Sequence, residues 1–184
     1  MDRRFFEALS ELAATEFPKL EADGLIVYGQ GRHFSSGADV GELVARLAGE
    51  GSEAGARFLA ESTLGFHALS ELPFPVVAAV GGCCFGSALE LALACHYRVA
   101  ARNAIFALPE TTFGLMPGVG GTVRLPKLVG VGKAIEIILT GRALLAEEAR
   151  TIGLVDLVVH RRRLLESAAR LIHKLNRATT HPAA

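Results

Sequence analysis

The sequence carries no excess of charge of either sign and no long apolar run. Its 184 residues include 19 lysines and arginines and 19 aspartates and glutamates, so the formal net charge is zero. A nucleic-acid-binding protein needs a basic face, and we expect the basic run Arg161–Arg163 to stand at the start of a solvated helix instead. No apolar stretch is long enough to span a bilayer, and Met1–Arg4 leads into an amphipathic helix rather than a signal segment. We therefore expect a cytoplasmic protein that binds neither nucleic acid nor membranes.

Cysteine is scarce, and its pattern argues against two kinds of site. The three cysteines, Cys83, Cys84 and Cys95, are an odd number with two adjacent, which is a poor disulfide framework. No Cys-x-x-Cys or His-x-x-x-His spacing accompanies them, so we expect no metal site. We interpret all three as small buried apolar side chains.

Several enzyme motifs are also missing. The sequence has no Gly-Lys-Ser/Thr phosphate loop, and Gly118–Gly121 follows a proline rather than a strand, unlike a dinucleotide fingerprint. Ser35, Ser36 and Ser87 have no Gly-x-Ser-x-Gly frame, which argues against a serine hydrolase.

Helix-like and strand-like patterns alternate along the chain. Short continuous apolar runs bounded by glycine or proline are typical of strands buried on both faces of a parallel sheet. The alternation predicts an α/β fold with a largely parallel sheet, flanking helices and right-handed crossovers. We expect one core domain over residues 1–160, then a C-terminal helix and a disordered tail within 161–184. The predicted strands are Leu25–Tyr28, Val76–Val80, Tyr97–Ala101, Ala104–Leu108 and Val155–Val159; the predicted helices are Arg3–Phe17, Val40–Leu47, Ala56–Leu72, Ser87–Cys95, Thr122–Leu128, Gly132–Leu139, Ala146–Thr151 and Arg162–Arg177; a turn is predicted at Gly81–Gly86 and a loop at Pro109–Gly121.

Two glutamates, Glu90 and Glu110, stand in an apolar, glycine-rich setting. Each has a structural interpretation, because acids are favoured in the first turn of a helix and can cap the turn after a strand. Together they favour chemistry, since each follows an apolar strand and the carboxyl ends of parallel strands share one sheet edge. We expect Glu90 to ionise easily near its helix N-terminus and Glu110 to hold its proton better among apolar neighbours.

The glycine-rich loops give backbone N–H groups a second use. Gly86–Ala88 leads into a helix, and Ser35–Asp39 follows the first strand. N–H groups from two such loops can converge on one oxygen and stabilise an oxyanion, although each loop taken alone is better explained as a tight turn. Other polar residues have simpler explanations: we expect His33 in a loop and His96 packed in the core.

Four segments of the chain resemble the crotonase superfamily, the enoyl-CoA hydratase/isomerase family. They are Gly31–Asp39, Pro75–Ala100, Phe106–Leu125 and Leu139–Val155. The most specific motif, Pro-Glu-x-x-x-Gly-x-x-Pro-Gly-x-Gly-Gly-Thr, begins at Pro109. The resemblance implies a ββα spiral fold, usually a trimer or a dimer of trimers, and an acyl-CoA thioester as substrate, with coenzyme A present only as part of it.

The resemblance also implies roles for individual residues. The N–H groups of Ala38 and Ser87 match the family's oxyanion hole, and Glu90 and Glu110 match the acids of its hydratases. Glu90 would help to activate a water molecule that adds at C3, and Glu110 would deliver a proton to C2, a syn addition. The residues expected to bind substrate are Arg32, His33, Gly37, Asp39, Gly86, Pro117 and Gly118.

The sequence departs from the family pattern in places. Ser87 stands where glycine is usual, and His96 stands where aspartate is common. The family's opening strands and its closing C-terminal helices have no full counterpart, so we expect a member shortened at both ends. Two alternatives therefore stay open beside a hydratase: a double-bond isomerase, which often needs only the acid matching Glu110, and a non-catalytic or partner-dependent subunit.

Overall fold

The structure is a computed structural model that describes residues 1–39, 41, 53 and 59–180. The predicted helix Val40–Leu47 and the first residues of the predicted helix Ala56–Leu72 lie outside the described residues, as does the end of the predicted tail. The remainder of the second of these helices is present and spans residues 59–70.

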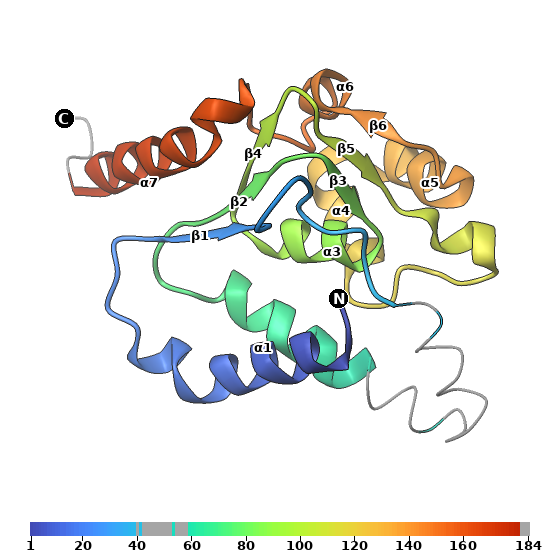
Figure 1. Cartoon of the computed structure of the whole chain (residues 1–184), viewed down its shortest axis with the longest axis horizontal. Helices are drawn as coiled ribbons and strands as arrows, with labels where there is room; N and C mark the ends of the chain where they lie inside the picture. Colours follow the sequence, from blue (N-terminus) through green and yellow to red (C-terminus); the bar gives the residue numbers. More distant parts are fainter. Residues whose placement is uncertain (40, 42–52, 54–58, 181–184) are drawn as a thin grey trace.

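Two sheets form the centre of the fold (Figure 1). The main sheet consists of the parallel strands β1 (Leu25–Tyr28), β2 (Val76–Val80), β4 (Tyr97–Ala101) and β7 (Leu157–Val159), in that order. The second sheet contains β3 (Cys83–Phe85), β5 (Ile105–Ala107) and β6 (Leu144–Leu145), with β3 parallel and β6 antiparallel to β5. The α/β fold and the largely parallel sheet are confirmed.

Helices cover both faces of the main sheet. The helices are α1 (Arg3–Thr15), residues 59–70, α3 (Ser87–Ala94), α4 (Gly121–Val129), α5 (Val131–Thr140), α6 (Ala146–Thr151) and α7 (Leu164–Thr180), with short 3₁₀ turns η1 (Phe17–Lys19), η2 (Pro109–Phe113) and η3 (Arg161–Arg163). Alternate residues of β2 serve the two faces: Val76, Ala78 and Val80 belong to the larger core, while Val77 and Ala79 pack with α7.

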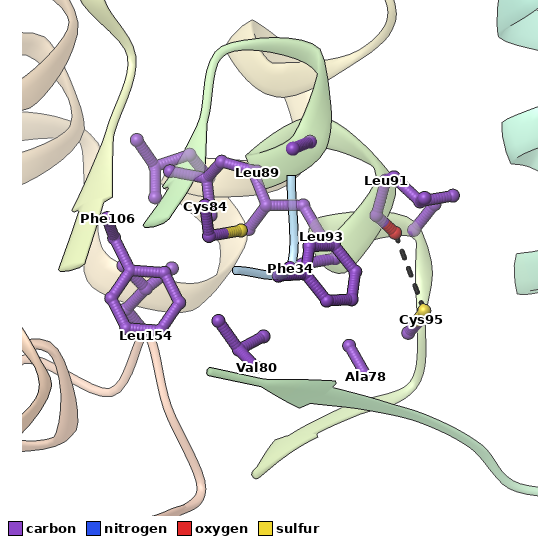
Figure 2. Close-up of a cluster of buried hydrophobic side chains, with 14 of the residues drawn as sticks. Phe34, Ala78, Val80, Cys84, Leu89, Leu91, Leu93, Cys95, Phe106 and Leu154 are labelled. Atoms are coloured by element: carbon purple, nitrogen blue, oxygen red, sulfur yellow. Dashed lines mark hydrogen bonds between the residues drawn. The ribbon is translucent and has the colours of Figure 1, made fainter. Parts of the chain in front are cut away.

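The larger core is built around α3, whose residues are all buried. Figure 2 shows Leu89 and Leu93 of this helix among side chains of β2, β3 and β5, including Val80, Cys84 and Phe106. A helix that is apolar nearly all round is expected to be enclosed by other elements, so this arrangement agrees with the sequence.

The C-terminal end of α3 is fixed by a buried arginine. Arg98 on β4, 2% exposed, donates to the carbonyl oxygens of Cys95 at 2.9 Å and Leu154 at 2.8 Å, and it pairs with Asp156 at 3.4 Å. Carbonyls at a helix end have no partner within the helix, so Arg98 joins the end of α3 to the segment before β7.

Several predicted boundaries were wrong, and the following four concern the site and the C-terminal end. Gly81–Gly86 contains the strand β3, whose partners are the distant β5 and Ser35 rather than local residues. The loop Pro109–Gly121 begins with η2. The last strand is shorter than Val155–Val159 and starts at Leu157. The last helix, α7, begins at Leu164 and continues to Thr180, beyond the predicted start of the tail.

Contacts along α7 hold this helix against the main sheet and the segment before β1. Ala168 and Ile172 pack on Val77 and Val99 of the main sheet, and the Asn176 side chain donates to the carbonyl oxygen of Asp23 at 2.7 Å. Burying an isoleucine side chain contributes roughly 1.5–3 kcal/mol, and most helical stability in proteins comes from such packing.

Candidate active site

An apolar cavity of about 360 Å³ lies at the N-terminal end of α3. Four segments supply its polar groups: the loop with Ala38, the helix of residues 59–70 with Ser62, the start of α3 with Ser87 and Glu90, and η2 with Glu110. Its other walls are largely apolar and include Phe6, Leu59, Phe85, Phe113, Met116 and Val119. The structure thus brings both predicted acids and both predicted oxyanion residues to one cavity.

The loop that carries Ala38 is held against β3 by backbone hydrogen bonds. Ser35 N–H donates to the carbonyl oxygen of Cys83 at 3.1 Å, and Phe85 N–H donates to that of Ser35 at 3.2 Å. Gly37 follows with φ of 98°, in the region that favours glycine. A Cβ at Gly37 would lie 2.6 Å from the carbonyl oxygen of Phe85, so only glycine lets Ala38 come this close to the start of α3.

Ser87 is the first residue of α3 and follows Gly86, which has φ of 56°. The first N–H groups of a helix have no partner within it and point toward whatever lies in front. A Cβ added at Gly37 would lie 3.7 Å from the backbone nitrogen of Ser87. The loop before Ala38 therefore closely approaches the start of α3. The arrangement places a helix N-terminus at the cavity.

Glu90 is 2% exposed, and one of its two carboxyl oxygens accepts two backbone hydrogen bonds. Its Oε1 accepts the N–H groups of Val119 at 2.9 Å and Gly121 at 2.8 Å. Burial raises the pKa of Glu90 to about 7; the two N–H groups and the charge of Arg124 act in the opposite direction, while Glu110 raises it further. The prediction that Glu90 ionises easily was wrong, because the loss of water outweighs the favourable helix position.

Glu110 reaches the cavity from η2. The carbonyl oxygen of Glu110 accepts Leu115 N–H at 3.0 Å, and the next residue, Thr111, donates its hydroxyl to the carbonyl oxygen of Ile138 at 2.9 Å. Burial raises the pKa of Glu110, in the predicted direction. A Cβ at Gly86 would lie 3.0 Å from Glu110 Oε1 and would crowd this carboxyl group, and the φ of 56° at Gly86 itself favours glycine.

Two buried polar atoms at this cavity lack a partner. Glu110 Oε2 and the Ser87 hydroxyl are both buried, and neither has a hydrogen-bond partner among the described residues. Most buried polar side-chain atoms in native structures are hydrogen-bonded, and an unpaired one costs about 1–3 kcal/mol. Two such atoms at one apolar cavity point to a polar ligand that completes them.

The other predicted binding residues divide into two groups. Gly37, Gly86 and Gly118 line the cavity. Pro117 is buried beside Gly121, close to Glu90 but outside the lining, and Asp39 is exposed.

The remaining two predicted binding residues, Arg32 and His33, are exposed and do not line this cavity. The Nδ1 atom of His33 accepts Cys83 N–H at 3.0 Å, and the carbonyl oxygen of Arg32 accepts Arg161 Nη1 at 2.8 Å. In these contacts both residues fix the loop that leads to Ala38.

His96 has a structural role, as expected. Its Nδ1 accepts Val76 N–H at 2.9 Å, so its Nε2 donates to the carbonyl oxygen of Ser70 at 3.1 Å.

The cysteines differ in burial. Cys84 and Cys95 are buried, which raises the pKa of both thiols, whereas Cys83 is only half-buried. In the described part of the chain, no three His, Cys, Asp or Glu side chains gather where they could hold a metal ion. None of the helices within the described residues is long and apolar enough to cross a membrane.

Sequence reasoning missed several residues of the site. It did not identify the N–H groups of Val119 and Gly121 as donors to Glu90, nor the cavity walls formed by Phe6 and Leu59. The glycines after Pro117 were a visible signal for a close backbone approach. Nothing in the local pattern around Leu59 distinguishes a cavity wall from ordinary core.

The fold brings two carboxyl groups and a helix N-terminus to one apolar cavity. The chain matches the family model of enoyl-CoA hydratase/isomerase over residues 6–184. The protein therefore belongs to the enoyl-CoA hydratase/isomerase family, the crotonases.

Individual relatives agree with this assignment. The chain is 41% identical over 186 residues to a fatty acid oxidation complex subunit alpha of Vibrio cholerae, covering 97% of this chain and 26% of that protein. It is similar to the enoyl-CoA hydratase of Bacillus anthracis, with 37% identity, a TM-score of 0.83 and coverage of 93% of this chain and 65% of that one. A Thermobifida fusca protein solved in complex with acetoacetyl-CoA has 29% identity, a TM-score of 0.83 and coverage of 94% and 69%. The chain thus spans about a quarter of the length of the curated relative.

Proposed function

We propose that the protein is an enoyl-CoA hydratase, which adds water across the 2,3 double bond of an enoyl-CoA thioester. The observation that carries this proposal is the presence of Glu90 and Glu110 at one apolar cavity, beside the N-terminal end of α3. The acyl-CoA class of substrate is supported by family membership and by the relative solved with acetoacetyl-CoA.

The proposed reaction begins with polarisation of the thioester. Its carbonyl oxygen accepts the N–H groups of Ala38 and Ser87, which stabilise the negative charge that develops there. Glu90, as a carboxylate, takes a proton from water while the water oxygen bonds to C3. The electron pair of the double bond moves toward the thioester carbonyl and forms an enolate.

A proton from Glu110 completes the addition. The enolate takes this proton at C2, which leaves Glu110 ionised and Glu90 protonated, and proton exchange with solvent restores both acids. In the proposed reaction both carboxyl groups act from the same side of the bound double bond, so that oxygen and hydrogen add to the same face. Burial raises the pKa of Glu110 and so favours its protonated form relative to an exposed glutamate. A pKa of about 7 leaves a substantial fraction of Glu90 ionised at neutral pH.

A hydration assay tests the proposal. Purified protein mixed with a short 2-enoyl-CoA should remove the conjugated thioester absorbance, and Glu90→Gln and Glu110→Gln should each slow this by at least about 10²-fold. Glu166→Gln, a change in an exposed ion pair on α7, is the matched control and should retain activity. Absence of turnover with the parent protein across acyl chain lengths would refute the proposal.

A second substrate separates hydration from isomerisation. Isomerisation of a 3-enoyl-CoA that relies on Glu110 alone should survive in Glu90→Gln, whereas hydration of a 2-enoyl-CoA should be abolished in that variant. Calorimetric titration with an acyl-CoA covers the non-catalytic alternative, in which the isolated chain fails to bind. We further propose that the protein acts in cytoplasmic fatty acid metabolism as a trimer or hexamer, which light scattering tests.

A further inference from the structure

The turn Val119–Gly121 supplies both N–H groups that bind Glu90. These two N–H groups donate to a side chain and not to the backbone of a helix or strand. Val119 N–H and Gly121 N–H donate to Glu90 Oε1 at 2.9 and 2.8 Å. Gly120 between them has φ of 108°, a conformation that only glycine adopts without strain. The orientation of these two N–H groups therefore depends on what holds the turn from outside.

Arg124 on α4 holds this turn. Its Nη1 donates to the carbonyl oxygen of Val119 at 3.0 Å, while Arg124 N–H donates to the carbonyl oxygen of Gly120 at 2.9 Å. A Cβ at Gly120 would lie 1.9 Å from the same Nη1, so the guanidinium rests directly against the glycine. The bond to Gly120 is the i→i−4 bond that starts α4, so the contribution specific to the arginine is the hydrogen bond of its side chain to Val119.

We infer that Arg124 is a positioning residue for Glu90: it fixes the Val119–Gly121 turn so that both N–H groups face the carboxylate, and its charge favours the ionised form of Glu90. The inference rests on the proposed hydratase function, in which Glu90 is the base. Arg124 itself does not line the cavity and is assigned no contact with substrate.

The charges around Glu90 are few. Glu110 faces it from η2 and raises its pKa, and Arg124 faces it from α4 and lowers it. Cys95, at the end of α3, interacts with Arg124. Arg124 is half-buried, which strengthens its effect on a buried neighbour relative to a fully solvated cation.

The chain offers a matched control for Arg124. Lys127 lies on the same helix, is exposed and carries the same charge. Together with Arg124 it lines a surface cleft that is separate from the cavity at Glu90 and Glu110. No hydrogen bond from Lys127 to the Val119–Gly121 turn is present in the described structure. Comparing Arg124→Ala with Lys127→Ala therefore separates a specific clamp from a general loss of positive charge on α4.

The first readout does not depend on turnover. In protein labelled with ¹³C at the glutamate carboxyl carbons, the Glu90 signal is assigned by its loss in Glu90→Gln and followed against pH. We expect its midpoint to rise in Arg124→Ala and to stay near the parent value in Lys127→Ala. If the alanine variant does not fold, Arg124→Gln, which keeps a donor but not the charge, should show the same rise. Equal midpoints in the Arg124 and Lys127 variants would overturn the inference.

The second readout uses hydration. Arg124→Ala should lose on the order of 10-fold to 10²-fold in kcat near pH 7, as expected when a catalytic group is misplaced, with partial recovery as the pH rises past the shifted midpoint. Arg124→Lys, which keeps the charge without the planar donor, should show less of the pH shift and retain part of the rate loss. A parent protein without turnover would refute the hydratase proposal, while the carboxyl titration would still decide the role of Arg124.

Discussion

The unpaired hydroxyl of Ser87 leads to a prediction that couples stability to activity. In the described structure this buried Oγ makes no hydrogen bond, and the residue is 8% exposed. A buried polar group without a partner costs about 1–3 kcal/mol. Ser87→Ala removes that cost and keeps the backbone N–H, so we expect the free energy of unfolding to rise by about 1 kcal/mol. For a chain of this size that corresponds to a Tm increase of about 2–4 °C.

The same substitution should reduce activity. If a bound thioester supplies the missing partner, losing this hydrogen bond costs about 0.5–1.5 kcal/mol, or up to about tenfold in kcat/KM. Ser87→Gly should match the alanine variant in activity but be less stable by about 0.5–1 kcal/mol, because glycine is more flexible in the unfolded chain.

Thermal unfolding with and without an acyl-CoA, at one protein concentration, measures both effects. Ser70→Ala is the control, since the Ser70 hydroxyl already donates to the carbonyl oxygen of His67 at 2.7 Å and its loss should not raise Tm. A lower Tm for Ser87→Ala without ligand would refute the reasoning, because the hydroxyl would then already be satisfied.

Two further predictions concern Glu90 and Gly37. The folded pKa of Glu90 is about 7 against an ordinary value of 4.5, so the unfolded state releases this proton first and stability falls as pH rises between those values. Glu90→Gln should remove this slope and gain up to about 3 kcal/mol above pH 7 in urea unfolding; an unchanged slope would contradict it. Gly37→Ala, with its Cβ 2.6 Å from the Phe85 carbonyl oxygen, should destabilise by about 1–3 kcal/mol and suppress hydration. Gly31→Ala has a similar positive φ but nothing within 4 Å of the Cβ, so it should leave hydration intact, and equal losses in both variants would exclude the steric explanation.

Local patterns predicted much of the fold correctly. The apolar runs Leu25–Tyr28 and Val76–Val80 are strands with the predicted boundaries. The predicted burial on both faces is confirmed for Val76–Val80. It was wrong for Leu25–Tyr28, which is half-buried at the edge of the sheet and ends at the exposed Tyr28. The strand β3 was missed since Gly81 and Gly82 suggest a turn, whereas its pairing comes from Ser35 and from β5. Hydrogen bonds between segments distant in sequence leave little local signal.

The site shows the same division. The positions of Glu90 and Glu110 at one cavity follow from strand order and from the family resemblance. The pKa direction of Glu90 does not, because it depends on how deeply the turn around Gly120 covers the carboxyl group. An acid in the first turn of an exposed helix has a lowered pKa, whereas the same acid covered by a second loop has a raised pKa. The local sequence does not distinguish the two cases.

Because α3 is anchored at both ends, the part of the cavity lining that it supplies is fixed in position, whereas other lining residues can be substituted more freely. Its N-terminal end is set by Gly86 and its C-terminal end by Arg98, so a change in substrate size cannot easily be accommodated by sliding this helix. Leu59, Phe113 and Met116 line the cavity from other segments, and all three retain substantial exposure. Under the proposed function, substitutions there reshape the space for the acyl chain while the two acids stay in place. Acyl-chain selectivity could therefore evolve at those three positions independently of the reaction chemistry.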